Sequence, residues 1–326
     1  MQDLFLHNLT EIRLSYCERC ELLPTFGKLP FLKDLTITGM HAVKYIGNEF
    51  HGDSAISFPS LRSFNLLCVD NLEKWGKINE RESFSHLSRL SISYCPKLVE
   101  LPIIPSLTSL YITSCPKIIE LPIIPSLTRL YIEINCATLF SSVMNLTSLS
   151  DLALFSSVMI VLPDGLFQKH KMLESLNIPL VRNFKPLANQ LNNLSTLKDL
   201  KLSCCDEIEN LLDTLQNMHS LRLLEIVGFK FFLSFPANGL RDLSSLQKLW
   251  IKDCDALYSL SEGIQYLTNL EDLIIKRCPK LMSLPEVNLV AEVQVYKALG
   301  IAKDSSNLPR AKFSLCLLSA FRSRKD

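Results

Sequence analysis

Apolar side chains recur along this chain in one frame. A leucine is followed three residues later by an apolar residue and five residues later by another, and the frame returns every 20 to 29 residues. This alternation is typical of a short strand with one buried face. A weaker thirteenth frame holds Val290, Val293 and Val295. The twelve regular frames begin at Leu9, Leu32, Leu61, Leu87, Leu107, Leu127, Leu149, Leu173, Leu197, Leu221, Leu246 and Leu270.

This spacing is the pattern of leucine-rich repeats, which have about 20–29 residues per unit. One such coil cannot bury its apolar face alone, so stacked coils share a continuous core. The predicted fold is an α/β leucine-rich-repeat solenoid, curved, with a parallel sheet on its concave face and an irregular, 3₁₀ or short helical convex face. We expect about 12–13 coils over residues 1–298, a loop insertion near residues 45–60, and a basic non-repeat tail over residues 299–326.

The far side of each coil is also readable. Apolar residues stand eleven and fourteen places after the first leucine, as at Leu98 and Leu101, and proline often follows directly. Proline lacks an N–H donor and disfavours a helix before it. The short coils are therefore expected to be extended or 3₁₀-like there, whereas coils of 24 residues have room for a helical turn, as at residues 164–173.

Many of the eleven cysteines occupy one slot of the repeat. Six stand eight residues after a first leucine, where these repeats take Asn or Cys. A small side chain there can face inward and bond weakly to the backbone of the next coil. Cys20 falls on the inward slot eleven places after Leu9, so the C-x-x-C of Cys17 and Cys20 is interpreted as framework rather than as a zinc or redox motif. The inward thiols are expected to be reduced and inert.

The sequence contains none of the common catalytic or nucleotide-binding motifs. Phosphate loops, dinucleotide-binding glycines, nucleophile elbows and zinc-protease motifs are absent from it. The 34 basic and 33 acidic residues balance, which gives no attraction to nucleic acid or to an anionic membrane. No signal peptide and no membrane span are recognised. We therefore expect a cytoplasmic, non-enzymatic chain with no catalytic, metal or cofactor-binding residues, no cofactor, and proteins as partners.

Partner recognition is expected on the outward strand positions, which are free of core packing. Exposed aromatic residues and arginines anchor protein interfaces. The candidate residues form a first group of Tyr16, Tyr94, Tyr111, Tyr131 and Phe155 and a second group of Trp250, Lys252, Lys276 and Arg277, together with Arg129, Glu133 and Lys201.

A duplicated segment supports the division between framework and surface. Residues 95–112 recur 20 residues further on with 15 of 18 identical. The inward slot changes only from Leu98 to Ile118, whereas Ser109 becomes Arg129 on the outward face. Just beyond the matched stretch Ser114 becomes Ile134, which we expect on the same outward face.

Residues 9–75 closely resemble the repeat region of plant intracellular nucleotide-binding, leucine-rich-repeat disease-resistance proteins of the coiled-coil type. The pieces that carry the resemblance are CERCELLPTFGKLPFLKDL, GMHAVKYIGNEFHG, FPSLRSFNL and LEKW, and the later CPKLxxLP segments extend it to about residues 1–285. It implies a recognition module of a plant innate immune receptor. Such a module would sense a pathogen effector or host guardee, or contact the nucleotide-binding domain of its own receptor in autoinhibition, without itself carrying the nucleotide-binding switch. A substrate adaptor of a ubiquitin ligase and an extracellular repeat inhibitor stay open as alternatives.

Overall fold

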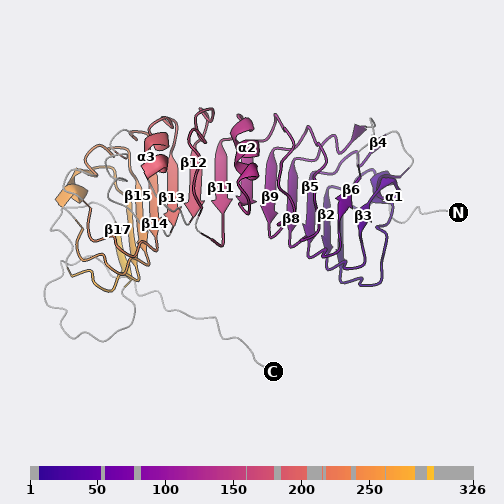
Figure 1. Ribbon diagram of the computed structural model, residues 1–326, viewed down its shortest axis with the longest axis horizontal. Coiled ribbons are helices and arrows are strands. Elements are labelled where there is room, and N and C mark those ends of the chain that lie inside the picture. The colour runs from indigo at the N-terminus through magenta and orange to yellow at the C-terminus, as the bar shows by residue number, and fades with distance from the viewer. Residues whose placement is uncertain are drawn as a thin grey trace, which may run out of the picture.

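Thirteen parallel strands form one continuous sheet along the molecule (Figure 1). The computed structural model describes residues 7–52, 56–76, 82–158, 160–179, 185–203, 215, 218–235, 240–260, 262–282 and 292–296. Each strand starts two residues after the first position of its frame, and neighbours in the sheet follow one another along the chain, so the predicted parallel-sheet solenoid is confirmed. The strands are β1 (Glu11–Ser15), β2 (Asp34–Thr38), β5 (Ser63–Leu67), β8 (Arg89–Ser93), β9 (Ser109–Thr113), β10 (Arg129–Glu133), β11 (Asp151–Phe155), β12 (Ser175–Pro179), β13 (Asp199–Ser203), β14 (Leu223–Val227), β15 (Lys248–Lys252), β16 (Asp272–Lys276) and β17 (Glu292–Tyr296).

The coils stack in strict register. The N–H of Thr128 donates to the carbonyl of Thr108, and the N–H of Thr108 donates to that of Ser88, each at 3.0 Å. Equivalent residues of successive coils therefore lie side by side, as Tyr111 and Tyr131 do. Residues about 20 to 29 positions apart in sequence become neighbours on the sheet.

The inward strand side chains form one core through the stack. Leu130 and Ile132 are fully buried, and so are the equivalent residues of the other coils from the second to the twelfth. The slots eleven and fourteen places after the first leucine are buried as predicted in most described coils, as at Leu98 and Leu101, whereas Leu281 is only partly buried. The members of these slots at Phe184, Ile208, Leu211 and Leu284 lie outside the described residues. Cys20 is an exception: it is exposed, and the prediction that it faces inward is wrong. Its coil holds the edge strand β1, so in the described part of the chain only one neighbouring coil packs against it.

Hydroxyl groups tie the coils together where the chain enters each strand. Ser106, just before its first leucine, donates from Oγ toward the carbonyls of Phe84 and Leu87, both at 2.8 Å. Ser126 repeats this arrangement one coil later, with its Oγ 2.7 Å from the carbonyl of Leu107. Loop carbonyls that no strand can satisfy thus obtain a donor, which avoids the cost of unpaired polar groups.

The insertion near residues 45–60 is built into the stack. It contains β3 (Tyr45–Ile46), α1 (Asn48–His51) and β4 (Ile56–Ser57). The next coil contains β6 (Lys74–Trp75) and β7 (Glu82–Ser83), which pair in parallel with β3 and β4, respectively. The 3₁₀ helix η1 (Phe26–Lys28) lies against α1 so closely that a Cβ on Gly27 would stand 2.0 Å from the carbonyl oxygen of His51. Only glycine fits this contact.

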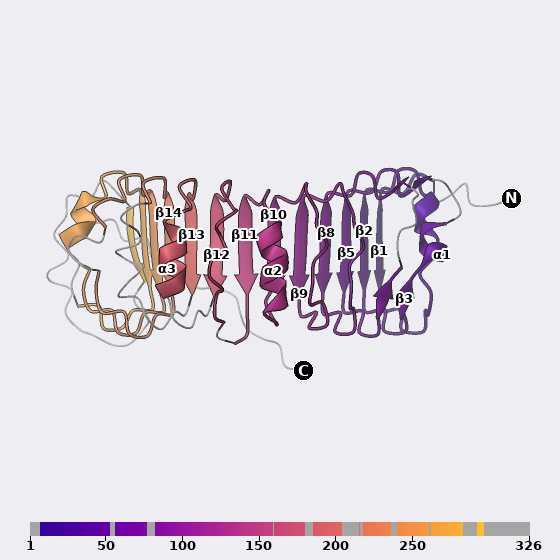
Figure 2. The same ribbon diagram turned by 45° about the horizontal axis from the view of Figure 1, so that its top comes forward.

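The convex side carries few helices (Figure 2). Those that the described residues form, besides α1 and η1, are α2 (Thr138–Asn145), α3 (Lys185–Leu191) and the 3₁₀ helix η2 (Glu262–Tyr266), and Figure 2 shows α2 and α3 on one side of the sheet. The coils that begin at Leu87 and Leu107 carry no helix after their strands, as their prolines predicted. The helical turn predicted at residues 164–173 is wrong, because residues 164–169 form successive turns instead.

Ile134 is buried, so the prediction that it lies on the outward face is also wrong. The equivalent residue in most other described coils adopts a left-handed backbone, as Ser114 does at φ 54°. A β-branched residue disfavours that conformation. The chain instead turns toward α2, and the Ile134 side chain enters the core.

Candidate protein-recognition face

Two tyrosines form a stacked pair at the centre of the concave face. Tyr111 and Tyr131 are the middle residues of β9 and β10, with ring centroids 4.5 Å apart and an interplanar angle of 8°. The Tyr131 hydroxyl donates to Oδ2 of Asp151 at 2.7 Å. Partial burial, and to a smaller extent this hydrogen bond, raises the pKa of Tyr131. The pair is held in one orientation while both side chains remain partly exposed.

The other aromatic candidates surround this pair unevenly. Tyr94, one coil before Tyr111, and Tyr16, on the first coil, follow their strands in a left-handed conformation and are 56% and 67% exposed. Tyr16 rests on Gly39 of the next coil, where an added Cβ would come within 2.5 Å of the ring. Phe155 ends β11 and is 37% exposed. Residues of the first group therefore lie on four consecutive coils, but Tyr16 is separated from them by β2 and β5.

Arg129 and Glu133 occupy opposite ends of β10. Oε2 of Glu133 accepts hydrogen bonds from the backbone N–H and the Oγ hydroxyl of Ser114, at 2.5 and 3.4 Å. Glu133 therefore holds the turn that follows β9. Arg129 is exposed at the other end of its strand, where it lines the rim of the sheet.

The second group is organised around a carboxylate. Glu225, in the middle of β14, is only 12% exposed, and its side chain contacts Nζ of Lys252 at 2.5 Å and Nζ of Lys201 at 3.5 Å. The two ammonium groups lie 4.7 and 6.0 Å from the ring centroid of Trp250. Nε1–H of Trp250 donates to Oδ2 of Asp272 at 3.0 Å. Cations near a tryptophan face are attracted by its ring electrons, so the group is held by its own contacts.

Sequence reasoning missed the acidic members of both groups. Asp151, Glu225 and Asp272 each orient a candidate side chain, yet none was predicted as a site residue. The signal was a diagonal across the register, because Tyr131 and Asp151 stand 20 residues apart and Trp250 and Asp272 stand 22 apart, each two residues short of the local repeat. A long side chain at the middle of one strand therefore reaches the first residue of the next strand once the strands are aligned.

Arg277 belongs to an ion pair of its own. Its guanidinium makes two hydrogen bonds to Asp253 of the preceding coil, with Nη2 at 2.5 Å from Oδ2. These bonds lower the pKa of Asp253. Lys276 lies opposite Lys252 in the sheet register. The structure thus places Lys276 beside the tryptophan group and Arg277 just past the end of the strands.

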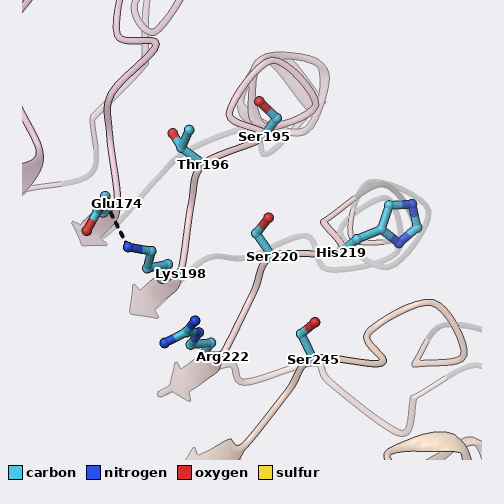
Figure 3. Close-up of a pocket in the computed structure, with 8 residues that line it drawn as sticks. All are labelled: Glu174, Ser195, Thr196, Lys198, His219, Ser220, Arg222 and Ser245. Carbon is cyan, nitrogen blue, oxygen red and sulfur yellow. Dashed lines mark ion pairs between the residues drawn. The ribbon is translucent and has the colours of Figure 1, made fainter.

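A shallow groove runs along the rim where the chain enters β12 to β15. It contains a hollow of about 390 Å³, lined by Glu174, Ser195, Thr196, Lys198, His219, Ser220, Arg222 and Ser245. Figure 3 shows Lys198 turned toward Glu174, with which it forms an ion pair at 2.7 Å. A second hollow of the same volume shares Glu174 and Lys198 and reaches Arg129 and Asp151. Acidic and basic side chains both line the groove, which suits mixed polar contacts rather than phosphate recognition.

Three cysteines of the repeat slot are buried as predicted but have a different hydrogen-bond partner, Cys17 and Cys278 are partly buried, and Cys205 lies outside the described residues. Cys95, Cys115 and Cys254 are buried, and all cysteines in the described residues are free thiols. Each donates to the carbonyl two residues earlier in its own strand, as Cys254 does to Lys252 at 3.4 Å; Cys115 also reaches the previous coil, at 3.9 Å from the carbonyl of Ile92. Within the described ranges no three His, Cys, Asp or Glu residues gather as metal ligands. The same part of the chain contains no helix long and apolar enough to cross a membrane.

Comparison with known proteins finds leucine-rich-repeat and plant disease-resistance sequences that are similar to this chain. A family described as R13L1/DRL21 LRRs matches residues 1–40. Disease resistance protein RGA1 of Solanum bulbocastanum is 30% identical over 193 residues, which is 59% of this chain and 17% of that protein. Disease resistance RPP13-like protein 1 of Arabidopsis thaliana is 36% identical over 107 residues, covering 29% of this chain and 10% of that protein. The predicted resemblance to the leucine-rich-repeat region of plant disease-resistance proteins is confirmed.

A structural comparison gives matches of low sequence identity. An internalin from Listeria monocytogenes has 16% sequence identity and a TM-score of 0.41, covering 87% of this chain and 88% of that chain. The plant relatives are much longer than this chain, which spans 17% of the first and 10% of the second.

Proposed function

We propose that this chain, whose repeats resemble those of plant disease-resistance proteins, is a cytoplasmic protein-recognition module that binds partners on its concave face. The partners that the resemblance suggests are a pathogen effector, a host guardee, or the nucleotide-binding domain of an immune receptor held inactive by the contact. The observation that carries the proposal is the stacked Tyr111–Tyr131 pair, which presents two partly exposed aromatic side chains on adjacent strands.

The energetic argument rests on preorganisation. Binding costs about 0.5–1.5 kcal/mol for each flexible side chain that a partner must immobilise. The tyrosine pair and the Trp250 group are already held by Asp151, by Asp272 and by Glu225, so less of this cost remains. Tyrosine, tryptophan and arginine residues also dominate measured interface energies. The Trp250 group adds lysines around its tryptophan, which favours a partner with carboxylate groups near an apolar contact.

The proposal can be tested with two double variants of matched kind. Tyr111→Ala with Tyr131→Ala removes the stacked pair, whereas Ile103→Ala with Ile123→Ala removes two exposed apolar side chains, 65% and 67% exposed, between the convex prolines of neighbouring coils. Proximity labelling in plant leaf cells would identify proteins near the wild-type chain. Purified candidates, and a receptor nucleotide-binding domain, would then be titrated against all three proteins.

A recognition role predicts a loss of at least about 30-fold in affinity for the tyrosine variant, as for a side-chain pair worth 2 kcal/mol or more. The isoleucine variant should bind as wild type does. Unchanged affinity in the tyrosine variant, with the circular dichroism spectrum preserved, would remove the pair from the interface. Equal loss in both variants would place binding elsewhere. Dependence on a ubiquitin-ligase subunit would favour the adaptor alternative.

A further inference from the structure

Two pairs of cysteines face each other across neighbouring coils. The slot eight residues after the first position of a frame holds cysteine in consecutive coils only twice, at Cys95 and Cys115 and at Cys254 and Cys278. Lys252 lies opposite Lys276 in the sheet, so Cys254 and Cys278, two residues further on in each coil, come opposite each other. Neighbouring strands lie about 4.8 Å apart, within the range of about 4.4–6.8 Å between the Cα atoms of a disulfide.

The thiols of the second pair also point the same way. Sγ of Cys254 lies 3.4 Å from the carbonyl of Lys252, and Sγ of Cys278 lies 3.5 Å from the carbonyl of Lys276. The neighbouring Cys254 thiol lowers the pKa of Cys278, whereas the Cys278 thiol raises the pKa of Cys254. A lower pKa increases the fraction of reactive thiolate.

The pairs differ in their access to solvent. Cys95 and Cys115 are 0% and 3% exposed, and Cys254 is 0% exposed, whereas Cys278 is only partly buried. The first pair has the same coil register, and its thiols donate in the same way to the carbonyls two residues earlier. Cys95 and Cys115 therefore serve as an internal control, a similarly placed pair of thiols that solvent does not reach.

We propose that Cys278 and Cys254 are a modification site, a dithiol that a peroxide oxidises to a disulfide joining the coils of β15 and β16. The Cys278 thiolate attacks one oxygen of hydrogen peroxide and becomes a sulfenic acid, and the other oxygen leaves as hydroxide, which takes a proton to form water. The Cys254 thiol then attacks the sulfenic sulfur, forming the S–S bond and releasing a second water. Two thiols lose two electrons in total, and one peroxide is reduced to two water molecules.

The position of this site links it to the strand face. Asp253 and Arg277, which form the exposed ion pair, immediately precede the two cysteines in their coils. A disulfide would fix the spacing of the coils that carry Trp250 and Lys276. The inference departs from the expectation that all inward thiols are inert, and the partial exposure of Cys278 is the reason.

The test is peptide mapping of the folded full-length chain after graded hydrogen peroxide. Free thiols are alkylated, the protein is cut with trypsin without reduction, and peptides are weighed. Tryptic residues 253–276 and 278–280 carry one cysteine each, and residues 90–97 and 98–117 carry Cys95 and Cys115. We expect a cross-link of 253–276 to 278–280 that has lost two hydrogens, at peroxide doses that leave Cys95 and Cys115 alkylated.

Single variants separate the two chemical steps. Cys254→Ser should leave Cys278 as a sulfenic acid that dimedone traps, and Cys278→Ser should leave Cys254 reduced. Dimedone labelling without any cross-link in the wild-type protein would show that the thiols do not meet, and an unreactive Cys278 would show that it is not accessible. Cross-linking of Cys95 to Cys115 at the same dose would mean that unfolding exposes both pairs. Each of these three results overturns the proposal.

Discussion

His51 makes the stability of the N-terminal coils depend on pH. It ends α1 at 9% exposure, with the rings of Phe50, Phe58 and Phe84 between 5.2 and 5.8 Å from its own. Its Nδ1 lies 3.3 Å from Oγ of Ser57. Burial lowers the pKa of His51 from 6.5 to about 4, against a smaller opposing effect of the nearby Glu49 carboxylate.

The sign of the effect follows from which state takes up the proton. Between pH 6.5 and about 4 the unfolded chain protonates His51 while the folded chain keeps it neutral. The stabilisation is therefore complete above pH 6.5 and is lost progressively as the pH falls to about 4. The difference in proton affinity corresponds to about 3 kcal/mol, at roughly 1.4 kcal/mol per tenfold change.

Tryptophan fluorescence gives a local assay. The chain has only two tryptophans, and Trp75 is buried with its ring 5.4 Å from that of Phe64 and 6.2 Å from that of Phe84. In a Trp250→Phe background, urea titrations at pH 7 and pH 4.5 would follow the N-terminal coils alone. The parent should lose about 2–3 kcal/mol more than its His51→Gln derivative between these pH values.

A second histidine provides the control. His170 is also buried, and burial lowers its pKa, but it packs near Phe167 in a different part of the array. His170→Gln should leave the pH response of Trp75 as in the parent. If His51→Gln and the parent lost the same stability on acidification, the link between burial and the pKa of His51 would be refuted.

Three further outcomes are expected. Leu130→Ala empties a fully buried slot and should cost about 2–5 kcal/mol in chemical denaturation, whereas Ile123→Ala, at 67% exposure, should stay within about 0.5 kcal/mol. Gly27→Ala forces a Cβ against the carbonyl oxygen of His51 and should lower the melting temperature of the N-terminal coils; an unchanged melt would argue against that contact. Glu225→Gln leaves two ammonium groups near each other and should cost about 1 kcal/mol at low salt, with a smaller loss in high salt that distinguishes a charge effect from a packing effect.

The strands could be predicted from the sequence because the same pattern of buried and exposed positions recurs in every repeat. Leu130 and Ile132 occupy slots that are apolar in every frame, so one exceptional residue could not mislead the assignment. The parallel sheet then followed from stacking, since neighbouring coils expose the same backbone groups. Errors fell where a residue departs from its slot, as with Ile134, whose branched side chain avoids the left-handed turn.

The candidate site was harder to predict because side-chain partners lie one coil away. Trp250 and Tyr131 were found from their outward positions, but the carboxylates that hold them were not. The exposure of Cys20 shows the same limit at an edge, where a slot has a neighbour on one side only. The insertion after Ile46 was predicted as a loop, and its strands depend on pairing with β6 and β7, which one coil alone cannot reveal.

The rim hydroxyls have a consequence for how such a gene can change. Ser106 and Ser126 each donate to the carbonyl of the first leucine in the coil before them, and the strand N–H groups bond to equivalent carbonyls from coil to coil. A whole coil that is gained or lost by unequal recombination therefore meets a neighbour with matching donors and acceptors on both sides. Rearrangements of one full period preserve the backbone hydrogen bonds between strands across the junction, whereas those of half a period leave carbonyls without donors. The coil is thus the unit that can be added or removed. The length of a coil can vary only in the segments that lie outside the strands and their hydrogen bonds.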